Sequence, residues 1–206
     1  DRQSDYCWYV DPLDGTTNFA HSYPAFCVSI GLAHAGELIA GVVFDPVRNE
    51  MFSAEKGAGA YLNNRRIRVS NVPSLGVSLL ATGFPSRKRH EDVNVYFFHQ
   101  LGGKAHGIRR SGSAAIDLAN VASGRLDGFW EFGLHPWDVA AGLLLVSEAG
   151  GRYTDMRGGP FDFNSPHLIA DNGHLHEEFV AFVAKIFAGE ITVPIPGLHR
   201  PVQDRY

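Results

Sequence analysis

Apolar and polar residues alternate in short runs along the first third of the chain, and glycine, asparagine or proline stands between most of the runs. Short strands joined by turns of this kind are typical of an antiparallel meander. The pattern therefore predicts one antiparallel sheet within residues 1–72. Its strands are expected at residues 7–10, 26–33, 38–44, 50–54, 60–62 and 66–69.

After residue 73 some apolar positions take up helical spacing, and these segments alternate with short apolar runs. The clearest helix is residues 136–149, which begins with a proline and ends at Gly150-Gly151. Strands that alternate with helices favour a parallel or mixed sheet, so residues 73–191 are predicted to form an α/β half. Residues 192–206 are predicted to be an irregular tail. Strands are expected at 78–82, 107–110, 128–132, 152–154 and 168–170, and the other helices at 92–101, 113–123 and 175–187.

The composition excludes several classes of protein. Apolar residues make up 45% and charged residues 19%, as in ordinary globular proteins, and the formal net charge is −4. This charge argues against direct nucleic-acid binding through phosphate neutralisation. No stretch of ~18 apolar residues predicts a membrane span. The basic cluster at residues 87–90 is interpreted as a solvated loop.

The chain contains two cysteines, Cys7 and Cys27, and no C-x-x-C motif. Two cysteines do not form a disulfide framework in a chain of this size. Both lie in apolar stretches, so buried thiols are expected. A reducing, cytoplasmic location is therefore predicted.

Residues 11–17, Asp-Pro-Leu-Asp-Gly-Thr-Thr, carry the most informative chemistry. Pro12 restricts the backbone at the end of a strand, so that the carboxylates of Asp11 and Asp14 can converge. Hard cations such as Mg²⁺ prefer such oxygen ligands, and the Leu13 carbonyl can supply another. The following Gly-Thr-Thr allows close backbone approach to an anion at a helix start. The alternative is an ordinary turn with a local cap.

A second motif, His-Pro-Trp-Asp-Val-Ala-Ala, occupies residues 135–141. Asp138 falls in the first turn of the predicted helix, where the helix dipole favours a carboxylate. It is therefore either a ligand or simply an acid at a helix start. Trp137 is interpreted as a core residue, and His135 stays open as a ligand or general acid.

Residues 11–17 and 137–142, the latter continued by residues 148–151, resemble the two signature motifs of the inositol monophosphatase family. Residues 110–115 between them also resemble that family, and the resemblance extends over about residues 6–188. It implies a layered α/β fold, the αβαβα sandwich of sugar phosphatases. It further implies Mg²⁺ dependence, a homodimer, and a small phosphorylated polyol or sugar as substrate.

The resemblance also implies roles for individual residues. Asp11, Asp14 and Asp138 resemble the metal-binding carboxylates, of which Asp11 would bridge two ions, and the Leu13 carbonyl would be a further ligand. Together with Thr16 these three acids form the expected catalytic set. Asp117 is interpreted as structural, and a solvated strand-end charge stays an alternative for Glu131. Substrate binding is implied for Gly15, Thr16, Gly112, Ser113, Ala114 and Glu131.

The chain departs from the family pattern before the first motif. Members of the family carry N-terminal helices there, with a glutamate that completes the first metal site. Residues 1–6 do not match that segment. The expectation is therefore an N-terminally truncated member of the family that lacks these helices.

The expected function is Mg²⁺-dependent hydrolysis of a small phosphate monoester by metal-activated water, with inositol 1-phosphate as the first candidate. Fructose 1,6-bisphosphate, histidinol phosphate and adenosine 3′,5′-bisphosphate are alternative substrates. A non-catalytic regulatory or binding protein on the same scaffold is the alternative from a different class.

Overall fold

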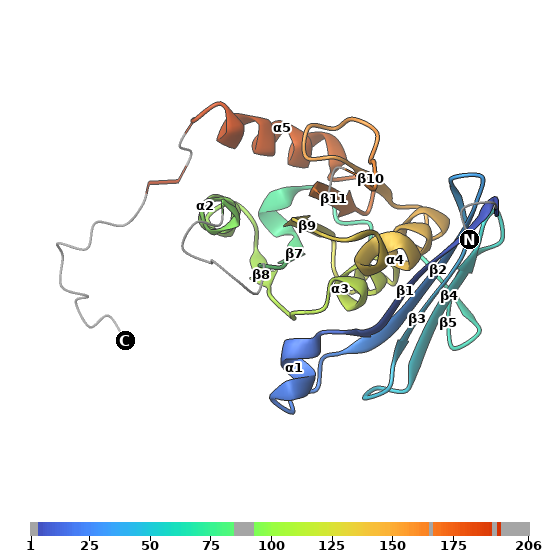
Figure 1. Cartoon of the computed structure of the whole chain (residues 1–206). Helices are drawn as coiled ribbons and strands as arrows, with labels where there is room; N and C mark the ends of the chain where they lie inside the picture. The colour runs from blue at the N-terminus through green and yellow to red at the C-terminus, as the bar shows by residue number, and fades with distance from the viewer. Residues whose placement is uncertain (1–3, 85–92, 165–166, 191–192, 195–206) are drawn as a thin grey trace.

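The computed structural model describes residues 4–84, 93–164, 167–190 and 193–194 (Figure 1). The predicted basic cluster at residues 87–90 and most of the predicted tail lie outside the described residues. The described part contains two β-sheets and two pairs of helices that alternate with them in layers.

The first six strands form one antiparallel sheet in which each strand pairs with its neighbour in sequence. This confirms the predicted meander. Asn63 and Asn64, both with positive φ, form the last turn, as their small polar side chains allow. The strands are β1 (Tyr6–Asp14), β2 (Cys27–His34), β3 (Glu37–Asp45), β4 (Glu50–Glu55), β5 (Gly59–Leu62) and β6 (Arg65–Ile67).

Strand β1 continues through Asp11 to Asp14, whereas the sequence predicts a strand only over residues 7–10. Its pairing with β2 shifts register between Asp11 and Asp14, as at a β-bulge. Pro12 is tolerated there because β1 is an edge strand, where a missing N–H costs no ladder hydrogen bond. Bulges re-aim side chains, and this one places both carboxylates on one pocket.

The second sheet has the strand order β10-β11-β9-β7-β8. Strand β7 pairs in parallel with β8 and β9, whereas the β9–β11 and β11–β10 pairs are antiparallel, so the sheet is mixed as predicted. Its strands are β7 (Leu79–Thr82), β8 (Gly107–Arg109), β9 (Gly128–Phe132), β10 (Arg152–Thr154) and β11 (His167–Asp171).

Helices α3 (Ala114–Ala122) and α4 (Pro136–Glu148) lie between the two sheets (Figure 1). Helices α2 (Asn94–Gly102) and α5 (His176–Phe187) cover the other face of the second sheet. Both pairs confirm the predicted helices, with ends that differ by one or two residues. The short helices are α1 (Thr16–Ala20) and the 3-10 turn η1 (Leu75–Val77).

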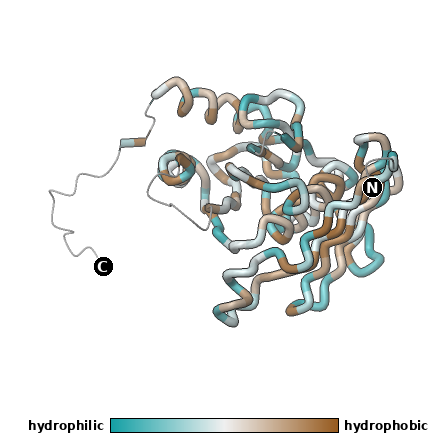
Figure 2. Tube along the Cα trace, in the orientation of Figure 1, coloured by the Kyte–Doolittle hydropathy of each residue, from teal (hydrophilic) through white to brown (hydrophobic). Residues whose placement is uncertain are grey.

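The main hydrophobic core lies around α3 and α4, and it joins side chains from both sheets. In Figure 2, hydrophobic positions are concentrated where the six-stranded sheet meets α4. Two glycines permit a close approach here: a Cβ at Gly31 would lie 2.8 Å from Ala140 Cβ, and one at Gly41 would lie 3.0 Å from Ala141 Cα. Helix α4 is thereby held directly over β2 and β3, and its start lies beside residues 11–14.

The opposite face of the six-stranded sheet is covered by none of the described helices. Tyr6, Trp8, Val10 and Met51 are exposed on it. None of the described helices combines the length and the apolar character needed to cross a membrane.

Cys7 is exposed, so the prediction of two buried thiols is wrong for this residue. It lies near the start of β1 at the edge of the sheet, where one side of the strand has no neighbour. Cys27, in the second strand, is buried as predicted.

We expect Gly31→Ala to lower the free energy of unfolding by about 1–3 kcal/mol, because the added methyl group would overpack the contact with α4. Gly76→Ala is the matched control, since a Cβ there meets no atom within 4 Å. Urea unfolding followed by circular dichroism measures both variants. Equal unfolding midpoints for the two would contradict the close packing of α4 on the sheet.

Candidate functional site

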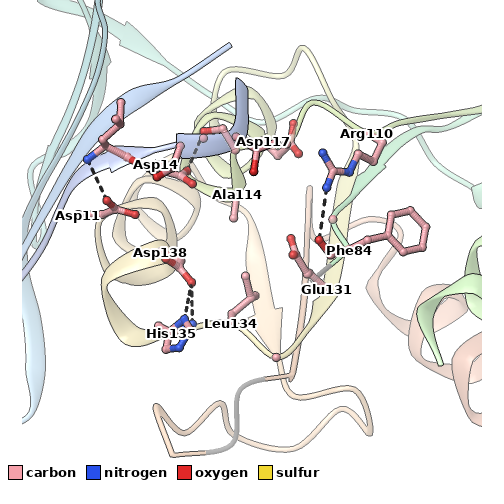
Figure 3. A pocket seen from close by; sticks show the side chains of 18 residues that line it. Asp11, Asp14, Phe84, Arg110, Ala114, Asp117, Glu131, Leu134, His135 and Asp138 are labelled. Atoms are coloured by element: carbon pink, nitrogen blue, oxygen red, sulfur yellow. Dashed lines mark hydrogen bonds and ion pairs between the residues drawn. The ribbon is translucent and has the colours of Figure 1, made fainter. Parts of the chain in front are cut away.

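A pocket of about 440 Å³ opens where the end of β1 meets β9 and the first turns of α3 and α4 (Figure 3). The structure places every residue predicted for the site on the wall of this pocket. They are Asp11, Leu13, Asp14, Gly15, Thr16, Gly112, Ser113, Ala114, Glu131 and Asp138. Motifs separated by more than one hundred residues in sequence thus meet at one place.

Asp14 is the most deeply anchored of the three predicted metal-binding acids. Its Oδ2 atom accepts hydrogen bonds from Ser113 Oγ at 2.7 Å and from the Ala115 backbone N–H at 2.8 Å. Burial raises the pKa of this carboxyl to about 6, and the nearby charges of Asp11 and Asp138 raise it further against the two hydrogen bonds.

Asp138 is part of the N-terminal cap of α4. Its Oδ2 atom accepts the His135 backbone N–H at 2.7 Å and lies 3.3 Å from His135 Nδ1, while Pro136 begins the helix. Burial raises the pKa of Asp138, and Asp11 adds to this, whereas the contacts with His135 lower it. Asp138 therefore caps the start of α4 and lines the pocket at the same time.

Asp11 is held by its own backbone turn. Its Oδ1 atom accepts the Leu13 N–H at 2.9 Å, and the Leu13 carbonyl accepts a hydrogen bond from Thr16 Oγ1 at 2.9 Å. Each of the three acids therefore has one oxygen bound by a protein donor. Within the described residues, the second oxygen of each makes no hydrogen bond, and Figure 3 shows the three carboxylates around the same part of the pocket.

The chemistry of this donor set fits a hard divalent cation, since carboxylate and carbonyl oxygens are its preferred ligands. The like charges that raise the pKa of Asp14 would be offset by a cation among them. Within the described residues, however, no three His, Cys, Asp or Glu side chains are already close enough to hold a metal ion. The ligand types fit, and their closure around an ion would need the free oxygens to move inward.

The Gly-Thr-Thr turn after Asp14 requires its glycine. Gly15 has φ of +91°, and a Cβ there would lie 2.7 Å from the Ala25 carbonyl oxygen. Asn18 then ties this turn to the loop before α3, since its Nδ2 donates to Ala25 O at 2.6 Å and to Ser111 O at 2.8 Å. The two segments expected to contact substrate are thus joined directly.

Gly112, in the loop before α3, also has a backbone conformation that favours glycine, with φ of +88°. A Cβ there would lie 2.6 Å from Arg110 Nη1. The next residue, Ser113, is the N-cap of α3 and accepts the Ile116 N–H at 3.3 Å. The same hydroxyl donates to Asp14, so helix capping and orientation of the acid are coupled.

Glu131 lines the pocket and is half-buried, which argues against the alternative of a solvated strand-end charge. Burial raises its pKa well above the usual range, and the charges of Asp117, Asp14 and Asp138 add to this, while Arg110 opposes it. A Cβ at position 83 would coincide with the Glu131 carboxylate.

Gly83 is a pocket residue that sequence reasoning missed. The available signal was a glycine directly after the buried strand 78–82, but the sequence does not show which side chain it faces. Asp117 was interpreted as structural, yet it also lines the pocket. Its signal was a carboxylate among the apolar residues of a buried helix. Thr17, Phe84, Arg110, Gly133, Leu134 and His135 complete the wall.

Trp137 is not a core residue, which corrects the prediction from its sequence. Its side chain is 43% exposed and stacks on His135, with ring centroids 4.7 Å apart and planes 7° apart. The reason is its position: the first turn of α4 lies at the rim of the pocket, with one side open to solvent.

Comparisons with known proteins find relatives in sequence and in structure. A sequence profile described as the inositol monophosphatase family matches residues 1–187. An inositol-1-monophosphatase of Synechocystis sp. is 52% identical over 174 residues, which are 84% of this chain and 61% of that protein. The Nus factor SuhB of Pseudomonas aeruginosa is 52% identical over 172 residues, covering 82% of this chain and 64% of that protein. The chain therefore spans less than two thirds of these two relatives.

A solved structure of an inositol monophosphatase from Anabaena (Nostoc) sp. superposes with a TM-score of 0.87 at 45% identity. It covers 90% of this chain and 74% of the Anabaena chain. This similarity confirms the predicted layered α/β fold.

The pKa of Asp14 makes a prediction about stability. Because it is about 6 in the folded chain and 3.8 in the reference state, the folded chain binds this proton more tightly, and stability from this group falls as pH rises between these values. We expect Asp14→Asn to remove this loss and to raise the free energy of unfolding at pH 7.5, without added metal, by about 1–2 kcal/mol. Urea titrations of both proteins at several pH values measure it. A variant less stable than the parent at pH 7.5 would refute this account.

Proposed function

The chain belongs to the inositol monophosphatase family, and from this we propose that it takes part in metal-dependent hydrolysis of a small phosphate monoester. The observation that carries the proposal is the arrangement of Asp11, Asp14 and Asp138. Each has one oxygen fixed by a protein donor and one free oxygen, beside a glycine turn suited to phosphate. The activity is a proposal because the chain spans only part of its relatives.

Mg²⁺ is the proposed cofactor, with Asp11, Asp14, Asp138 and the Leu13 carbonyl as ligands. When bound, it would supply Lewis-acid activation of a water and stabilisation of the leaving alkoxide. The protein contributes orientation, since backbone and serine donors hold each carboxylate by one oxygen. The backbone of Gly15 and Thr16 is proposed to bind the phosphate oxygens.

Direct attack by water is proposed, and it agrees with the hydrogen bonds that engage the hydroxyls of Ser113 and Thr16. Ser113 donates its hydroxyl proton to Asp14 and caps α3 with the same oxygen. Thr16 Oγ1 donates to Leu13. Cys27 is buried, and burial raises the pKa of its thiol, which keeps it protonated. A covalent phosphoenzyme is therefore not part of the proposal.

The charges of the pocket favour a monophosphate of a neutral polyol. Glu131 lines the pocket, and a carboxyl group there suits hydroxyl groups of a substrate. On the described wall Arg110 is the one arginine or lysine, so a second phosphate would find little positive charge to offset its own. Inositol 1-phosphate is accordingly the proposed substrate, before fructose 1,6-bisphosphate, histidinol phosphate and adenosine 3′,5′-bisphosphate. Homodimer formation and a cytoplasmic location stay predictions.

A non-catalytic binding function is the second candidate, because a relative of 52% identity is called a Nus factor. In that case the pocket would bind ions without turnover, and the chain would act through a protein partner. Phosphate release with Mg²⁺ separates the two candidates.

We expect Asp138→Asn to lower Mg²⁺-dependent phosphate release from inositol 1-phosphate at least ~100-fold, because the substitution removes one of the proposed metal ligands. Glu177→Gln, an acid exposed outside the pocket, is the matched control. A colorimetric phosphate assay measures turnover, and calorimetry measures Mg²⁺ binding. Turnover by the Asp138 variant equal to that of the control would disprove the assignment.

Gly83→Ala tests the substrate class. The added methyl group would displace Glu131, so we expect KM for inositol 1-phosphate to rise roughly tenfold while Mg²⁺ affinity stays unchanged. Gly76→Ala again serves as control. Steady-state kinetics with a panel of phosphate esters measures the effect, and an unchanged KM would mean that Glu131 does not contact the substrate.

A further inference from the structure

The hydroxyl of Ser111 has more acceptors than it can serve. Its Oγ lies 2.8 Å from Asp117 Oδ1 and 3.3 Å from the Ser113 carbonyl oxygen, and it accepts the Ser113 N–H at 3.3 Å. A serine has one hydroxyl proton, so it cannot donate to both acceptors at once. A proton on Asp117 resolves the conflict: Asp117 then donates to Ser111, and Ser111 donates to Ser113.

The surroundings of Asp117 favour that proton. Its side chain is 2% exposed, although it lies on the pocket wall. Burial raises its pKa to about 8, the charge of Asp14 on β1 adds to this, and Ser111 and Arg110 oppose it. Glu131 on β9 is the other charged group facing it. At neutral pH the carboxyl group is therefore mainly protonated.

Ser111 connects Asp117 to Asp14 through hydrogen bonds. The Ser111 hydroxyl accepts the backbone N–H of Ser113. The Oγ of Ser113 in turn donates to Asp14 at 2.7 Å. Its carbonyl also accepts from Asn18 of α1 at 2.8 Å. A change at Asp117 thus has a continuous hydrogen-bonded route to Asp14 and to the Gly-Thr-Thr turn.

We propose that protonated Asp117 is a positioning residue, which through Ser111 and Ser113 sets the orientation of Asp14 and of the substrate-facing loop at residues 111–113. Loss of the Asp117 proton turns the Ser111 hydroxyl toward the carboxylate and takes the donor away from Ser113. It also adds a negative charge to a pocket that receives an anion. The pocket is therefore coupled to pH through the hydrogen bonds of Ser111 and Ser113.

NMR on the metal-free chain tests this directly, with the aspartate carboxyl carbons labelled. We expect the Asp117 carbon to titrate near pH 8, and the backbone amides of Ser113 and Ala115 to shift with the same midpoint. A separate, lower step at these amides would belong to Asp14, which accepts hydrogen bonds from Ser113 and Ala115. An Asp117 carboxyl that has already lost its proton at neutral pH would overturn the proposal.

Two variants separate positioning from a structural role. Asp117→Asn keeps a hydrogen-bond donor for Ser111 but cannot ionise, so the upper step at Ser113 and Ala115 should disappear while the spectrum stays that of a folded chain. In Ser111→Ala the Asp117 carbon should still titrate, but the Ser113 amide should no longer follow it. Persistence of the upper step in Asp117→Asn would contradict the route.

A kinetic arm rests on the proposed function. For the parent chain we expect KM for inositol 1-phosphate to rise roughly three- to tenfold between about pH 7 and pH 9, and to stay level in Asp117→Asn. Equal pH profiles would count against the coupling. Absence of phosphate release from the parent chain would instead refute the proposed function, and the NMR result would still decide the role of Asp117.

Discussion

Burial of several carboxylates in one small pocket is the constraint on which the rest of the site depends. Asp11 and Asp14 come from a bulge in an edge strand, and Asp138 comes from the start of α4. They meet because Gly31 and Gly41 let that helix lie directly on the sheet. The raised pKa values of Asp14 and Asp138 show that burial and like charge work against this arrangement. Such a cost to stability is common where a site is built for function.

Hydrogen bonds to the protein make the arrangement specific. The anchoring donors are a turn N–H for Asp11, a serine hydroxyl and a helix N–H for Asp14, and a capping N–H for Asp138. Because each carboxylate is held by one oxygen, its other oxygen has a defined direction before any ligand arrives. The same serine that holds Asp14 belongs to the loop at residues 111–113, which lines the pocket. Asp14 and the loop at residues 111–113 are therefore parts of one hydrogen-bonded unit.

Much of the fold could be predicted from the sequence, because turn residues separate the strands of the meander. Helix α4 could also be predicted, because a proline begins it and glycines follow its end. Contacts between residues that lie far apart in the sequence could not be predicted from it. The contact of Gly83 with Glu131 depends on the parallel pairing of β7 with β9, which no local pattern specifies. Trp137 was misjudged because an aromatic residue in a helix is usually buried, whereas the pocket rim leaves it open. Asp117 was placed correctly on α3, but the rise in its pKa comes from burial and from the charge of Asp14 on β1, which the local sequence does not show.

A crystal structure of the chain grown with Mn²⁺ tests the central claim most directly, because Mn²⁺ accepts the same oxygen ligands and scatters anomalously. The account predicts an anomalous peak among the free oxygens of Asp11, Asp14 and Asp138, with the hydrogen bonds from Ser113 and His135 preserved. A crystal grown with Mn²⁺ that shows no anomalous peak at these three carboxylates, or shows its only peak elsewhere on the chain, would contradict the proposed metal site.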